Sequence, residues 1–222
     1  MHAVMWFNLM ARLGVKGSDP AANKWYNAMV DIYDGETHRV VHDLGYVRNM
    51  LFATDEIMYE IGDGDDEAME IAIWFAHSIH YPDRDPFQNI LGSAQLAGEF
   101  MKNLEIGDET FRQKVVRLIA IPGLAQTNYP NPFMALYDAN HEWMARDPER
   151  YKDHLIDLRQ EYSVLSNFEF GDMREAELRD IIARGYVFYS DPMQYQNDGA
   201  MSNAEAELKI WVDHRKTMLA SI

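Results

Sequence analysis

Residues 40–58 read VVHDLGYVRNMLFATDEIM, and this stretch decides the class of fold that the sequence predicts. Its apolar residues recur at steps of three and four, which is the spacing of one face of an α-helix. The residues on this face are Val40, Val41, Leu44, Val47, Met50, Leu51 and Met58. We therefore expect a helix of about twenty residues here, with one face in a hydrophobic core.

The same periodicity continues outward along the chain. Before this stretch, residues 4–10 form the apolar face of one helix, and another begins near Pro20 and ends at Asp34-Gly35. After it, a helix runs from about Glu67 through Ile79. Further helices are predicted at about 89–103, 109–121, 133–145, 148–170, 173–185 and 202–219. Only residues 186–189 (YVFY) resemble a strand, and they are too few to build a sheet. The sequence predicts one all-α domain over residues 1–222, with its core at about 20–185 and a C-terminal helix at about 202–219.

Composition narrows the classes of function. The formal net charge of −16 argues against a nucleic-acid surface, which needs clustered Lys and Arg side chains. The absence of cysteine excludes thiol catalysis and iron–sulfur clusters. No segment is long and apolar enough to span a bilayer, and residues 4–10 lack the basic start of a signal peptide. We expect a cytoplasmic protein that binds neither nucleic acid nor membrane.

Four of the eight histidines occur in pairs at helical spacing, His38 with His42 and His77 with His80. On a helix, such spacing places both imidazoles on one face, as metal ligation requires. The residues alone leave two interpretations open, a metal site or histidines with no ligand.

Several short motifs, in order along the chain, resemble those of one family. The segment Arg39–Leu51 resembles R-x-Y-H-N-x-x-H-I-x-x-M-L, and residues 73–81 (IWFAHSIHY) resemble A-x-W-F-H-D-x-x-Y. Residues 89–94 (NILGSA), 135–140 (ALYDAN) and 151–162, which end in RQEY, are similar to three later motifs. This set is typical of the small predicted metal-dependent phosphohydrolases of the HD superfamily. The resemblance covers nearly the whole chain and implies an HD-domain-like helical bundle.

The departures from that family concern its metal ligands. The resemblance implies a divalent metal held by a His, an adjacent His-Asp pair and a distal Asp. Tyr46 stands at the first of these positions, His77-Ser78 at the pair and Asn140 at the distal one, with Asp138 retained nearby. Neutral Tyr, Ser and Asn side chains do not supply the charge that neutralises a divalent cation. A metal cofactor is expected only if the site is rebuilt, for which the candidate ligands are His42, His77 and His80.

Three functions remain open. The first is a catalytically inactive HD-like protein that binds a small phosphorylated, nucleotide or other anionic ligand, or a partner. The residues expected to line its pocket are Arg39, His42, Tyr46, His77, Ser78, Asn140, Arg159, Glu161 and Tyr162. The second is an active hydrolase or other enzyme, with His42, His77 and Asp138 as candidate catalytic residues. The third is an interaction protein that uses its acidic surface. Arginine side chains that bind an anion through two hydrogen bonds would support the ligand-binding function. The same arginines could instead belong to a buried network of ion pairs.

Overall fold

The computed structural model describes residues 1–61, 66–120 and 131–219, and the regular secondary structure of these residues is entirely helical. The prediction of an all-α protein is confirmed. The elements are α1 (His2–Arg12), α2 (Pro20–Gly35), α3 (Leu44–Ile61), α4 (Asp66–Phe75), α5 (Pro86–Asn103), α6 (Glu109–Ala120), α7 (Asn131–His141), the 3-10 helix η2 (Glu142–Ala145), α8 (Pro148–Glu161), α9 (Asn167–Arg184), the 3-10 helix η3 (Asp191–Gln196) and α10 (Asn197–Leu219).

Three of these helices begin with the same local signal, an aspartate followed by proline. Asp19, Asp85 and Asp147 each accept a hydrogen bond from a backbone N–H in the first turn of α2, α5 and α8. The proline that follows needs no N–H partner at the first helical position and has a helical φ already. This signal moves the start of α5 to Pro86, three residues before the predicted start.

The predicted helix over 148–170 is wrong, because the chain breaks between α8 and α9. Arg159 stabilises the break by donating to the carbonyl oxygens of Tyr162 and Leu165 and to Asn167 Oδ1. Ser166 then starts α9 with a reciprocal capping box, in which its side chain and that of Glu169 bond to each other's backbone N–H. The next helix therefore begins at Asn167 and not at 173.

Residues 186–189 form no strand, and two side chains explain why. Asn197 Oδ1 accepts hydrogen bonds from the backbone N–H of Val187 and Phe188, both at 2.8 Å. Asp138 accepts from the next two, those of Tyr189 and Ser190, at 2.9 and 2.7 Å. The donors that a sheet would use are thus satisfied by side chains.

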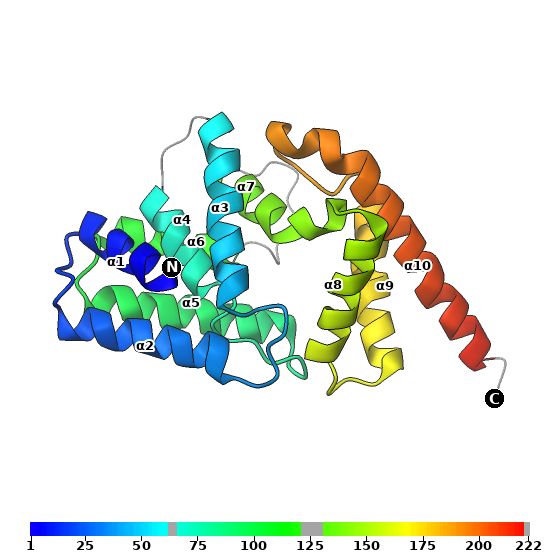
Figure 1. Cartoon of the computed structure of the whole chain (residues 1–222), viewed down its shortest axis with the longest axis horizontal. Helices are drawn as coiled ribbons and strands as arrows, with labels where there is room; N and C mark the ends of the chain where they lie inside the picture. The colour runs from blue at the N-terminus through cyan, green and yellow to red at the C-terminus, as the bar shows by residue number, and fades with distance from the viewer. Residues whose placement is uncertain (62–65, 121–130, 220–222) are drawn as a thin grey trace.

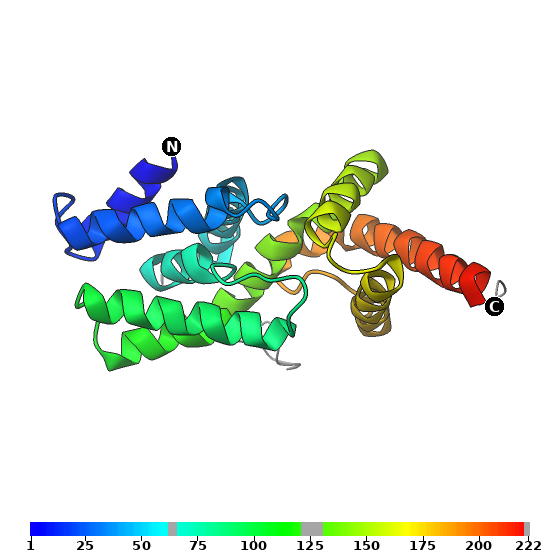
Figure 2. The same ribbon diagram turned by 90° about the horizontal axis from the view of Figure 1, so that it is seen from below.

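The helices gather on two sides of the molecule, as both ribbon views show (Figures 1 and 2). Helices α1, α2, α4, α5 and α6 lie on one side, and α8, α9 and α10 lie on the other. Helices α3 and α7 pack against each other and lie between the two sides.

One hydrophobic cluster runs through both groups of helices, from Trp6 in α1 to Ala204 in α10. The cluster therefore includes residues of both α1 and α10. No helix in the described part of the chain is long and apolar enough to cross a membrane.

Candidate functional site

Three histidines from two loops converge where the two groups of helices meet. His42 lies in the loop before α3, and His77 and His80 lie in the loop after α4, which ends at Phe75. The expectation that each histidine pair shares a helix face is therefore wrong. His38 stays outside the cluster, where its Nε2 lies 2.8 Å from the carbonyl oxygen of His80.

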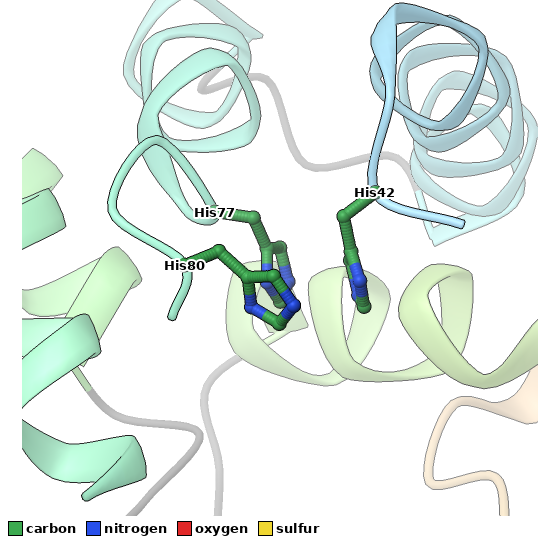
Figure 3. A group of neighbouring side chains, drawn as sticks. All are labelled: His42, His77 and His80. Atoms are coloured by element: carbon green, nitrogen blue, oxygen red, sulfur yellow. The ribbon is translucent and has the colours of Figure 1, made fainter. Parts of the chain in front are cut away.

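The three imidazoles are close enough to act together. The ring of His42 lies 4.3 Å from that of His77 and 4.5 Å from that of His80, measured between centroids. One ring nitrogen from each residue can be chosen so that all three lie within 4.8 Å of one another. Figure 3 shows the His77 and His80 rings leaving one loop toward the His42 ring opposite.

Glu161, at the end of α8, joins the two loops. Its Oε2 accepts hydrogen bonds from the backbone N–H of Val40, Val41 and His42, at 2.7–2.9 Å. Its Oε1 lies 2.5 Å from His42 Nδ1 and 2.8 Å from His80 Nε2. The carboxylate thus binds three consecutive backbone donors and orients two imidazoles.

This arrangement explains why α3 starts late. The sequence predicts a helix from Val40, but the backbone N–H groups of residues 40–42 point to Glu161, and regular α-helix begins only at Leu44. Asp43 accepts a hydrogen bond from the backbone N–H of Tyr46 and satisfies one donor of the first turn.

Arg39 holds the same two loops together through their backbone carbonyl oxygens. Its guanidinium donates to the carbonyl oxygens of His42, His77 and Ser78, and to Glu36. Arg39 was expected to bind a ligand, but in the structure it positions the backbone of His42 and His77.

The motif over residues 89–94 holds the second loop against α5. The side-chain amide of Asn89 donates to the carbonyl oxygen of Tyr81, at 2.9 Å. Ser93 Oγ accepts from the backbone N–H of Ile79, at 3.0 Å. These contacts fix the chain on both sides of His80.

The positions that the resemblance assigns to metal ligands do converge, but they do not fit that metal. The Tyr46 hydroxyl donates to Asn140 Oδ1, and the Tyr46 ring packs edge-on against His77 at 5.1 Å. Ser78 Oγ donates to the carbonyl oxygen of Phe75 and caps the end of α4. A hydrogen-bonded Tyr–Asn pair and a capping serine stand at three of these positions, and His77 stands at the fourth.

Two further candidates have other roles. Asp138 is fully buried and accepts hydrogen bonds from the backbone N–H of Tyr189 and from the backbone and hydroxyl of Ser190. Arg159 serves the α8–α9 turn described above. The structure therefore places neither side chain in the histidine cluster.

Two cavities adjoin the cluster, and His42 and Tyr162 line both. The larger, of about 510 Å³, lies between the start of α3, η2, α8 and α9. Its far wall carries Trp143, Arg146 and His154, which sequence reasoning missed because no motif marks them. The smaller, of about 490 Å³, also meets His77, His80 and Arg84.

The electrostatics keep two of the imidazoles neutral. Burial lowers the pKa of His80 to about 4, although its hydrogen bond with Glu161 acts in the opposite direction. Burial and the neighbouring His42 and His80 lower the pKa of His77 well below its usual value. Burial alone would raise the pKa of Glu161, but hydrogen bonds from His42, His80 and the backbone outweigh it and hold that pKa well below its usual range. The site thus combines neutral imidazoles with one carboxylate anion.

Comparison with known proteins found no family model that matches the chain, and no curated protein or solved structure that matches it.

Proposed function

We propose that the chain is an HD-domain-like protein that binds a small ligand beside the histidine cluster and does not carry out the hydrolysis typical of HD enzymes. The Tyr46–Asn140 hydrogen bond carries this proposal. It joins the residues at two of the positions that the family resemblance gives to metal ligands, and neither residue carries a charge.

The chemistry of an HD enzyme depends on that charge. A divalent metal lowers the pKa of its bound water and polarises a phosphoryl oxygen, and its ligands must hold and partly neutralise it. Of the positions that the resemblance assigns to this task, only His77 keeps a ligating side chain. The scaffold can therefore keep a pocket without keeping the reaction.

The ligand we propose is a small phosphorylated molecule of the nucleotide type, bound in the 510 Å³ cavity. Trp143 and His154 stack at 4.1 Å and give the cavity an aromatic wall on which a base can lie. Among the residues that the structure describes, the Arg146 side chain donates only to Glu142, which leaves donors that can meet a phosphate. Arg39 and Arg159, by contrast, already donate to backbone carbonyl oxygens and to the side chains of Glu36 and Asn167.

Calorimetric titration with nucleoside mono-, di- and triphosphates and with inorganic phosphate tests this proposal. We expect Arg146→Gln to weaken nucleotide binding about 10-fold, as loss of one charge-assisted hydrogen bond predicts. Arg150→Gln, which removes a largely exposed arginine on α8, serves as the matched control and should leave binding unchanged. No binding by the wild type would exclude this ligand class, and equal affinities in all three proteins would exclude Arg146 as the phosphate contact.

A phosphate-release assay on the same compounds tests the second half of the proposal. We expect no turnover above that of a heat-treated sample. Turnover in the wild type that disappears in His77→Ala would instead establish an active hydrolase.

A further inference from the structure

The histidine cluster has a feature that ligand binding in the larger cavity does not use. His42, His77 and His80 present one nitrogen each within 4.8 Å of the others, and Glu161 lies behind two of the rings. We propose that these three imidazoles bind one late first-row transition-metal ion of the Zn²⁺ type, with Glu161 as a positioning residue. This site differs from the set that the family resemblance implies, since it shares only His77 with it, and it does not depend on the nucleotide proposal.

The hydrogen bonds of Glu161 prepare two of the rings for ligation. A carboxylate only accepts hydrogen bonds, so His42 Nδ1 and His80 Nε2 must carry the ring protons. In the neutral form of each ring, the other nitrogen, His42 Nε2 or His80 Nδ1, carries a lone pair. Metal-bound histidines almost always donate their second ring N–H to a carboxylate or carbonyl in this way, which fixes the tautomer and makes the ligand more basic.

His77 supplies the third imidazole. Within the described residues, its ring nitrogens make no hydrogen bond, while its backbone carbonyl is held by Arg39 at 2.8 Å. The ring is stacked on that of His42, with 4.3 Å between the two centroids. A neutral imidazole with a free lone pair is the form that ligates a metal.

The spacing is close to that of a tetrahedral site. Zn–N bonds of about 2.0–2.1 Å place two ligand nitrogens about 3.4 Å apart. One nitrogen of each ring already lies within 4.8 Å of the others, and rotation of the side chains has to bring His42 Nε2, His80 Nδ1 and one His77 nitrogen to about 3.4 Å.

Nitrogen donors also select the class of ion. Imidazole suits Zn²⁺, Co²⁺, Ni²⁺, Cu²⁺ and Fe²⁺, whereas Mg²⁺ and Ca²⁺ prefer oxygen ligands. Three protein ligands leave the fourth tetrahedral position open. His42 lines both cavities, so a molecule in either one approaches the metal.

The test is a metal titration of the full chain, purified without a histidine tag and stripped with a chelator. We expect one Zn²⁺ or Co²⁺ per chain, with Mg²⁺ not competing, and a visible Co²⁺ spectrum typical of a four-coordinate site. His77→Ala should weaken Zn²⁺ binding more than 10-fold. Glu161→Gln should weaken it about 10- to 100-fold, the range found when a carboxylate behind a ligating histidine is lost.

The matched control is His214→Ala, which removes an exposed imidazole on α10 and should bind metal as the wild type does. Circular dichroism checks that each variant is folded. If His77→Ala is not folded, His77→Gln, which retains more of the side-chain volume, replaces it. Absence of one-to-one binding in the wild type, or unchanged affinity in the His77 variant, overturns the proposal. Since bound metal is measured directly, this result is independent of whether the cavity binds a nucleotide.

Discussion

Glu161 and Glu207 are two buried glutamates that each accept several hydrogen bonds, but the donors that surround them differ. Glu207, in α10, accepts hydrogen bonds from Arg174 Nε and Nη2, from the Tyr151 hydroxyl and from Trp211 Nε1. Arg174 is a permanent cation, so the charge of Glu207 is balanced inside the protein. Glu161 accepts from backbone N–H groups and imidazoles, and no arginine in the described part of the chain donates to it.

Because of this difference, Glu207 holds helices together, whereas we propose that Glu161 orients the histidines of a metal site. The Arg174–Glu207 pair joins α9 to α10 and uses its donors within the protein. The Glu161 cluster leaves lone pairs on neutral imidazoles beside an anion, and that combination attracts a metal cation.

The largest effect is expected from breaking the Glu207 pair. Arg174→Met leaves Glu207 buried without a cation and should lower the free energy of unfolding by about 3–5 kcal/mol. Urea denaturation followed by circular dichroism measures it. Lys209→Met, which breaks an exposed pair with Asp213 on α10, should change it by less than about 0.5 kcal/mol. Similar losses in both variants would show that burial of the Arg174 pair does not matter.

Asp138 provides a third buried carboxylate, whose hydrogen bonds come from Ser190 and the backbone of Tyr189. Burial raises its pKa to about 6, although these hydrogen bonds and Arg184 act in the opposite direction. The folded protein therefore binds this proton more tightly than the unfolded chain does, and the cost of burying the charged group disappears as the pH falls from about 6 to 4.

We expect the stability of the wild type relative to Asp138→Asn to rise by up to about 3 kcal/mol between pH 7 and pH 4. Urea denaturation of both proteins across this range measures the difference. A difference that stays constant with pH would contradict a raised pKa for Asp138.

A smaller effect is expected at Glu161 itself in the absence of metal. Glu161→Gln keeps the shape of the side chain but removes the charge that strengthens its hydrogen bonds, so the free energy of unfolding should fall by about 2 kcal/mol. A loss as large as that of Arg174→Met would mean that Glu161 is mainly structural. The same urea denaturation decides between the two.

The smallest effect concerns the turn that places Glu161 at the end of α8. Ser166→Ala removes the hydroxyl of the capping box and should cost about 1 kcal/mol. Ser163→Ala, four residues after Arg159 in the same turn, has no cap to remove and serves as the control. Thermal unfolding of both variants measures this difference. Equal unfolding midpoints would show that the Ser166 cap does not stabilise the break between α8 and α9.

Local patterns in the sequence predicted the helices well where a helix depends on nearby residues. The apolar spacing of Leu44, Val47, Met50 and Leu51 did mark the buried face of α3. Prolines and aspartates at 19–20, 85–86 and 147–148 mark three helix starts, one of which the prediction placed too late.

The site was predicted only in part, because its geometry depends on contacts between distant residues. Glu161 binds the backbone N–H of His42 across 119 positions, and no local pattern shows that α3 therefore begins only at Leu44. Tyr46, His77 and Asn140 do lie together in the fold. Arg39, Ser78 and Asp138 point toward backbone groups with which they form hydrogen bonds. These groups come close only when the chain is folded.

Zinc-dependent stability of three proteins tests the contrast between the two glutamates most directly. At a free Zn²⁺ concentration 100-fold above its dissociation constant, the wild type should gain about 2.7 kcal/mol in free energy of unfolding. Trp211→Phe, which removes one hydrogen bond to Glu207, should gain the same amount. Glu161→Gln should gain only about 0.4–1.4 kcal/mol, because its affinity is about 10- to 100-fold lower. Equal gains in the wild type and Glu161→Gln, or no gain in the wild type, would contradict the account.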